Sequence, residues 1–172
     1  MTIGFILNGE DVSVDADPGK RLTDILRRSF NLSRTKKGCY TGICSSCLVI
    51  INGDIVQSCL IPLFKVQGSE VITIEGFAQT DEYMDFYLGF KEAGLENCGF
   101  CNSGKILTAE ALLNRNPRPA REDIIAAFEG IKCRCNSLEN LIAGIMSAIE
   151  QRRRRIYGKP SGENNQKGGS QV

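Results

Sequence analysis

The stretch "GCYTGICSSC", residues 38–47, places cysteines at positions 39, 44 and 47. The 172-residue chain contains eight cysteines and no histidine. Its N-terminal segment "MTIGFILNGEDVSV" becomes polar before any long apolar run, so we expect no membrane span and a cytoplasmic protein. Cysteines in that compartment stay reduced, which favours metal or redox chemistry over disulfides.

Two further features of the composition exclude classes of function. The lack of histidine removes mixed Cys/His zinc sites, Rieske-type clusters and the commonest acid-base catalyst. The formal net charge of +1 argues against a nucleic-acid-binding protein. We therefore expect a globular protein whose chemistry depends on its thiols.

A predicted hairpin brings a fourth cysteine back to the opening stretch. Asn52 and Gly53 separate "CLVII" from "DIVQSC", and Asn-Gly supplies the positive φ angles of a type I′ turn. Residues facing each other across this turn have numbers that sum to about 105, which puts position 58 opposite Cys47. With the spacing C-x4-C-x2-C-x11-C, the thiols expected around one centre are Cys39, Cys44, Cys47 and Cys59.

These spacings predict a [2Fe-2S] cluster. Two tetrahedral irons need four thiolates, and a C-x4-C-x2-C loop with a remote fourth cysteine is the plant-type ferredoxin arrangement. Such a loop wraps closely around its cluster, so Gly38 and Gly42 are candidates for unusual backbone angles or close approach, although both also suit ordinary turns. A four-cysteine zinc site is the alternative, but it usually uses two C-x2-C pairs, and only one pair here has that spacing.

The rest of the chain divides into a strand-rich first part and a helical second part. "FILNGEDVSV" predicts a first hairpin, the segment from Leu22 to about Phe30 a helix, and Val71–Ile74 a strand. Helical spacing of apolar residues then predicts four helices, the last with a capping box formed by Asn136 and Glu139. The predicted class is α+β, with domains at residues 1–78 and 79–157 and a disordered tail at 158–172.

Four more cysteines precede predicted helices of the second domain with the spacing C-x2-C-x31-C-x-C: Cys98, Cys101, Cys133 and Cys135. Helix N-termini offer unpaired amides and partial positive charge, which stabilise thiolates. C-x2-C alone is also found in zinc knuckles and thiol-disulfide enzymes. Together with the C-x-C pair, in a chain that already has a ferredoxin-type loop, it predicts a second [2Fe-2S] cluster, with zinc as the alternative.

Both cysteine sets, in this order, resemble the small iron-sulfur subunit of the xanthine oxidase family of molybdenum hydroxylases, and "ENCGFCNSG" and "IKCRCNSLEN" are similar to its second-cluster motifs. The resemblance implies a β-grasp ferredoxin-like domain followed by a four-helix-bundle domain, each with one [2Fe-2S] cluster. It also implies a hetero-oligomer in which electrons leave molybdopterin on a large subunit, pass the helical-domain cluster and then the ferredoxin-like cluster, and reach FAD on a medium subunit or another acceptor.

The chain departs from the family pattern at several positions. The family usually has Gly at Ser45, Gln at Asn97, Thr-Pro at residues 102–103 and Thr-Gly-Tyr at residues 136–138. In family members the Gln contacts molybdopterin, so the resemblance makes Asn97 a candidate cofactor contact that is shorter by one methylene. The basic segment 152–155 is expected to complement a helix dipole, with docking to a partner as the alternative.

Three functions remain open from the sequence. The first is an electron-transfer subunit of a molybdenum hydroxylase acting on a purine or other N-heterocycle, an aldehyde or an aryl thioester. The second is a stand-alone two-cluster ferredoxin or redox-sensing module. The third is a zinc-stabilised interaction domain.

Overall fold

The strand-rich part of the chain forms a β-grasp domain. The computed structural model describes residues 1–131 and 133–158. In the first part of this range a five-stranded sheet has the strand order β2-β1-β5-β3-β4, with β1 and β5 parallel and the other neighbours antiparallel. Its elements are β1 (Thr2–Leu7), β2 (Glu10–Asp15), α1 (Leu22–Arg28), β3 (Leu48–Ile51), β4 (Asp54–Gln57), the 3₁₀-helix η1 (Leu63–Val66) and β5 (Glu70–Ile72).

Both predicted hairpin turns are present. Asn8 and Gly9 have φ angles of 52° and 87°, and Asn52 and Gly53 have φ angles of 50° and 88°, as a type I′ turn requires. The second turn pairs Leu48 with Gln57, which is the predicted register. Helix α1 covers one face of the sheet and buries its apolar side chains against those of β1.

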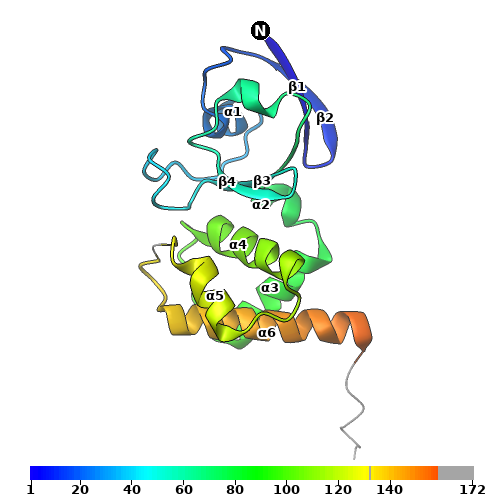
Figure 1. The fold of residues 1–172 in the computed structure, drawn as a ribbon, viewed down its shortest axis with the longest axis vertical. Coiled ribbons are helices and arrows are strands. Elements are labelled where there is room, and N and C mark those ends of the chain that lie inside the picture. Colours follow the sequence, from blue (N-terminus) through cyan, green and yellow to red (C-terminus); the bar gives the residue numbers. More distant parts are fainter. Residues whose placement is uncertain (132, 159–172) are drawn as a thin grey trace, which may run out of the picture.

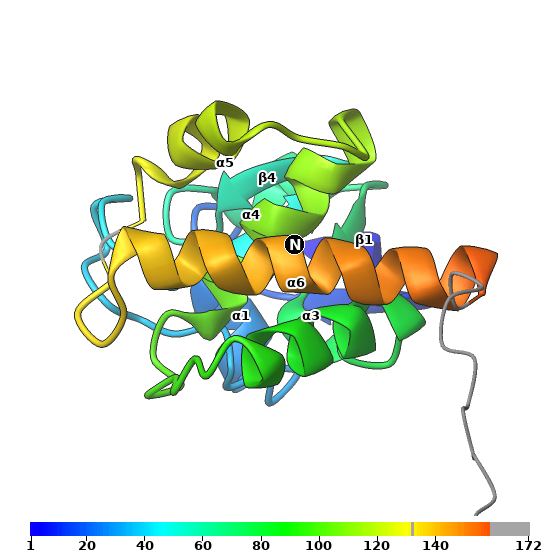
Figure 2. The same cartoon turned by 90° about the horizontal axis from the view of Figure 1, so that it is seen from below.

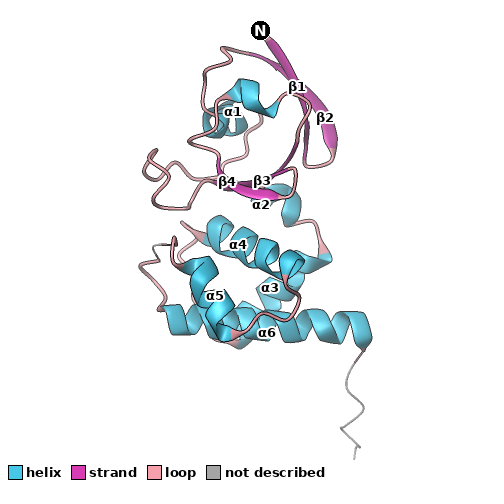
Figure 3. Cartoon of the chain, in the orientation of Figure 1, coloured by secondary structure: helices cyan, strands magenta, loops and turns pink. Residues whose placement is uncertain are grey.

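The second part of the chain is helical, and the predicted four-helix domain is confirmed (Figure 3). A long helix, α6, runs along one side of this domain beneath the others, with α3 packed along it and α5 also in contact with it (Figures 1 and 2). Phe86, Ile124 and Ile145 lie fully buried in the core that these helices share. The four helices of this domain are α3 (Asp81–Glu92), α4 (Asn102–Arg115), α5 (Arg121–Phe128) and α6 (Leu138–Tyr157), and the short helix α2 (Ile74–Phe77) precedes them.

The structure corrects several local predictions. Ile74 begins α2 and does not end the preceding strand, and α1 ends at Arg28 and not at Phe30. The N-cap of α6 is Ser137, whose hydroxyl accepts a hydrogen bond from the Asn140 amide; the side chain of Asn136 is used elsewhere. Among residues 1–131 and 133–158, no helix combines the length and apolar character needed to cross a bilayer. The predicted tail from residue 159 onward lies outside the described residues.

The two domains are joined by contacts between the cysteine loop and α4. The Ser103 hydroxyl donates a hydrogen bond of 3.1 Å to the Ser46 carbonyl. The Ser45 hydroxyl donates one of 3.0 Å to the carbonyl of Gly130. Gly104 packs so closely against the Ser45 carbonyl that an added Cβ would overlap with it. The first cysteine loop therefore lies directly on the N-terminal turn of α4.

Candidate functional site

The four cysteines of the β-grasp domain come together as two pairs. The backbone amide of Cys44 donates to Cys39 Sγ at 3.4 Å, and so does the amide of Thr41. Cys47 lies at the start of β3 and Cys59 follows β4; both are buried and their side chains interact. The hairpin thus returns Cys59 to Cys47, as its register predicts.

Gly38 and Gly42 both occupy positions where a side chain would disturb this loop. A Cβ at Gly38 would lie 2.5 Å from Cys44 Sγ and 2.7 Å from Ser46 Oγ. Gly42 has a φ angle of 81°, and its Cβ would lie 2.7 Å from a methyl group of Leu60. The first glycine therefore leaves room for a thiol, and the second permits a left-handed backbone turn.

The pKa values of these thiols differ because their surroundings differ. The Thr41 side chain and the amides of Thr41 and Cys44 lower the pKa of Cys39 to about 6. Burial raises the pKa of Cys47 to about 11. Metal binding requires the thiolate, so occupancy of this site would release a proton from Cys47, while Cys39 already has donors arranged around its sulfur.

The four cysteines of the helical domain also converge, although they come from two distant loops. Cys133 Sγ and Cys135 Sγ are 3.6 Å apart. Cys98 interacts with Cys135, and Cys101 with Cys133, so each thiol of the first loop meets one of the second. Cys101 is the N-cap residue of α4 and is buried, whereas Cys98 and Cys135 are exposed.

Amide and ammonium groups stabilise the thiolates of this second set. The backbone amide of Phe100 has the largest effect on Cys98 and lowers its pKa, and the side chain of Cys135 lowers this pKa further. Burial tends to raise the pKa of Cys133, but the Asn136 amide and Lys105 outweigh it and bring this pKa down to about 7. Burial raises the pKa of Cys101 to about 11 although Lys105 opposes it.

The arrangement in pairs fits a two-iron cluster. None of the eight cysteines forms a disulfide. A [2Fe-2S] cluster takes two thiolates on each of two irons, which matches two pairs of thiols in each domain. The donor sets therefore suit [2Fe-2S] clusters.

Several positions that depart from the family pattern have specific side-chain contacts, whereas the buried side-chain oxygen of Asn102 has no hydrogen-bond partner among the described residues. Ser45 has a φ angle of 53°, where glycine is easily accommodated, and its hydroxyl reaches the other domain. The hydroxyl of Ser103 joins the cysteine loop to α4, and Ser137 caps α6. Asn136 Nδ2 lies 3.1 Å from the Glu96 carbonyl and 3.2 Å from Asn97 Oδ1.

Lys105 lies beside the second cysteine set, and the sequence motifs did not single it out. Its side chain is 0% exposed, and its ammonium group donates a hydrogen bond of 2.7 Å to Asn97 Oδ1. The same nitrogen lies 4.0 Å from Cys135 Sγ. One feature of the sequence indicates this position: Lys105 follows Cys101 by four residues at the start of a helix, so both face the same side.

Comparisons with known proteins decide the family. Residues 5–71 match the "2Fe-2S iron-sulfur cluster binding domain" family, and residues 73–146 match the "[2Fe-2S] binding domain" family. The chain is 42% identical over 151 residues to the nicotinate dehydrogenase small FeS subunit of Eubacterium barkeri, a match covering 88% of this chain and 96% of that one. The chain belongs to the small iron-sulfur subunits of molybdenum hydroxylases.

Other matches of this iron-sulfur subunit agree. It is 36% identical over 150 residues to the alpha subunit of the isoquinoline 1-oxidoreductase of Brevundimonas diminuta, covering 87% of this chain and 98% of the relative. Its fold matches a chain in the crystal structure of quinoline 2-oxidoreductase from Pseudomonas putida 86 with a TM-score of 0.82 and 33% identity, over 90% of this chain and 96% of that one. The predicted α+β fold, the two [2Fe-2S] clusters and the electron-transfer role in an oxidoreductase are thereby confirmed.

Proposed function

We propose that this iron-sulfur subunit carries electrons from molybdopterin on a large partner subunit, through its two clusters, to FAD on a medium subunit or to another acceptor. The observation that carries this proposal is that the chain holds four cysteines in each of its two domains and that each set is arranged as two pairs. A [2Fe-2S] cluster supplies a one-electron centre when bound. Two such centres in contacting domains make a relay.

The pairing of the thiols supports the ligand sets that we propose for the relay. We assign one cluster to each domain, with the domains at residues 1–78 and 79–157. The cysteines that hold the first cluster are Cys39, Cys44, Cys47 and Cys59, and those that hold the second are Cys98, Cys101, Cys133 and Cys135. Gly38 and Gly42 shape the first loop, where any Cβ would meet neighbouring side chains.

The helical domain faces the molybdopterin subunit in this proposal. Cys98 and Cys135 are exposed, and Phe100 beside them is also exposed, so a partner can approach this set closely. The carboxamide oxygen of Asn97 is already engaged by Lys105 and Asn136. Contact between Asn97 and the partner's cofactor would therefore use the carboxamide nitrogen.

The proposed substrate class of the whole enzyme is an aromatic N-heterocycle. The relatives named above are subunits of a nicotinate dehydrogenase and of an isoquinoline 1-oxidoreductase, and the similar structure is a quinoline oxidoreductase. Substrate is selected by the large subunit, which holds the molybdenum centre. Eight cysteines that serve as cluster ligands suit a reducing compartment, and we place the protein in the cytoplasm.

Affinity purification of the chain from its native host under anaerobic conditions tests this proposal. We expect larger subunits to co-purify with molybdopterin and FAD, and the small subunit to carry about four irons and about four labile sulfides. Recovery of the chain alone with the same iron content would favour a stand-alone ferredoxin. A colourless, zinc-containing product would show an interaction domain without a redox role.

A further inference from the structure

Among the residues that the structure describes, no carboxylate pairs with the buried ammonium group of Lys105. The ion pairs that the structure forms within its described residues do not include Lys105. Glu110, the buried carboxylate on the same helix, is paired with Arg152 at 2.6 Å instead. A buried charge without a partner is very costly, so the counter-charge must come from another group.

The groups that surround this ammonium are the thiols of the second cysteine set. Its nitrogen lies 4.0 Å from Cys135 Sγ and interacts with the side chain of Cys133. Cys98 and Cys101 are also within its electrostatic influence. The natural counter-charge of Lys105 is therefore the negative charge of the thiolates and of the cluster that they hold.

Two asparagines hold the ammonium group in this place. Asn97 Oδ1 accepts its hydrogen bond of 2.7 Å, and Asn136 Nδ2 lies 3.2 Å from the same oxygen. Asn136 Nδ2 also lies 3.3 Å from Cys135 Sγ. Because these side chains and the fully buried Lys105 fix one another, the charge is held at a constant position next to the ligands.

We propose that Lys105 is a fixed cation that raises the reduction potential of the cluster held by the second cysteine set. This inference rests on the proposed function, because it requires an iron-sulfur cluster at that site. When one electron from an external reductant enters a [2Fe-2S] centre with four thiolates, the total charge changes from two negative charges to three, and no bond is made or broken. The reduced form is attracted to the ammonium group more strongly, so reduction becomes more favourable.

The size of the effect follows from the position of the charge. Two unit charges separated by about 4 Å at an effective dielectric constant of about 20 interact strongly enough to shift an equilibrium far more than tenfold. The added electron is shared by the cluster, which extends beyond the sulfur that Lys105 approaches. We therefore expect removal of the charge to change the reduction equilibrium at least tenfold.

The test is an anaerobic redox titration of the complete iron-sulfur subunit, with the two clusters followed separately by electron paramagnetic resonance. Lys105→Met removes the charge and keeps the apolar length. We expect it to lower the equilibrium constant for reduction of the helical-domain cluster at least tenfold, which is about 59 mV or more for a one-electron couple. Lys105→Arg keeps the charge and should change that constant less than threefold.

Two controls test whether the change in reduction potential is confined to the helical-domain cluster. Lys91 is an exposed lysine of the same domain, and Lys91→Met should leave both potentials unchanged because water screens its charge. The ferredoxin-type cluster in the other domain is an internal reference and should also stay unchanged in Lys105→Met. An unchanged potential of the helical-domain cluster in a Lys105→Met protein that retains its iron would overturn the inference.

A loss of the cluster from Lys105→Met is also informative. In that case Lys105→Gln, which is neutral but can still bond to Asn97, takes its place, and a potential lowered at least tenfold supports the inference. If both neutral variants lost the helical-domain cluster and only Lys105→Arg kept it, Lys105 would be needed for cluster retention, and the tuning role would be wrong. Failure of the wild-type chain to bind iron would instead contradict the proposed function itself.

Discussion

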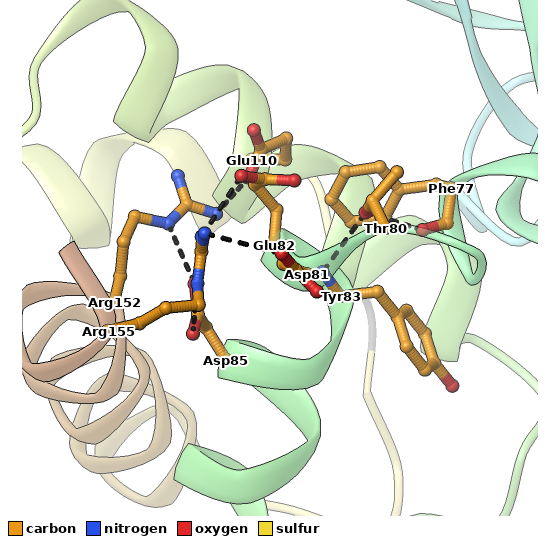
Figure 4. Close-up of polar contacts among 9 residues, drawn as sticks. All are labelled: Phe77, Thr80, Asp81, Glu82, Tyr83, Asp85, Glu110, Arg152 and Arg155. Carbon is orange, nitrogen blue, oxygen red and sulfur yellow. Dashed lines mark hydrogen bonds and ion pairs between the residues drawn. The ribbon is translucent and has the colours of Figure 1, made fainter.

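Replacement of Asp85 by asparagine is expected to destabilise the helical domain by about 2–3 kcal/mol. Asp85 is buried on α3 and accepts hydrogen bonds from two arginines of α6, at 3.4 Å from Arg152 Nε and at 3.1 Å and 2.8 Å from Arg155 (Figure 4). Arg152 also reaches Glu110 on α4 at 2.6 Å. These charges connect three helices of the domain.

The magnitude follows from what remains when the carboxylate is lost. Removal of one partner from a buried ion pair costs about 3–5 kcal/mol when the other charge is left alone. Here Arg152 keeps Glu110, and Arg155 keeps Glu82 at 3.0 Å. The cost is therefore close to that of one hydrogen bond to a charged group, about 1.5–3 kcal/mol, and we expect the upper part of this range because two arginines are affected.

Thermal unfolding of the subunit at a fixed scan rate, followed by far-ultraviolet circular dichroism, measures this loss. At about 2–4 °C for each kcal/mol in a chain of this size, Asp85→Asn should lower Tm by about 4–12 °C. The matched control is Asp81→Asn, because Asp81 is 80% exposed and lies 3.8 Å from the same Arg155, so it should change stability by about 0.5 kcal/mol or less. Equal effects of the two substitutions would refute the role given to the buried carboxylate.

Three other predictions follow from the structure. Gly104→Ala should destabilise the contact between the domains by about 1–3 kcal/mol, because its Cβ would overlap with the Ser45 carbonyl; Gly130→Ala, with no atom within 4 Å, is the thermal-unfolding control. Cys59→Ser should remove the ferredoxin-type cluster and leave the helical one, so that iron analysis gives about two irons per chain and electron paramagnetic resonance one signal. The pKa of Glu82 lies below its ordinary value of 4.5. A hydrogen bond from its own backbone amide has the largest effect, and Arg155 lowers the pKa further, while burial partly opposes both. The stability that the Glu82 carboxylate contributes is present above the unfolded-state pKa and is lost as the pH falls through the lower folded-state pKa. Glu82→Gln should therefore weaken the dependence of Tm on pH below about 4.5. The same dependence in the wild type and the variant would count against this role.

The sequence was sufficient to predict those parts of the structure that depend on residues close together in the chain. The turn at Asn52 and Gly53 is set by their own φ preferences, and the register that returns Cys59 to Cys47 follows from the turn. The spacing of the cysteines likewise predicts two sets of four thiols, and the assignment of these sets to clusters stays a prediction. These features are local, and their physical causes can be read directly from the chain.

Features that depend on packing between distant segments could not be predicted in the same way. The burial of Lys105 results from loops and helices closing around it, and a lysine in a helical pattern usually points to water. Arg152 and Arg155 were expected to complement a helix dipole, but they pair with acidic side chains of α3 and α4. The N-cap of α6 is Ser137 and not the predicted Asn136, because the side chain of Asn136 contacts Cys135 of the second cysteine set.

The contact between the first cysteine loop and α4 affects the rate of electron transfer between the two clusters. Electron tunnelling slows exponentially as the gap widens, and the bond from Ser103 to Ser46, with the close approach of Gly104 to Ser45, holds the two loops at one separation. Transfer inside the chain then needs no collision and no diffusive search. Its rate should be independent of protein concentration and solvent viscosity, unlike that of a mobile carrier.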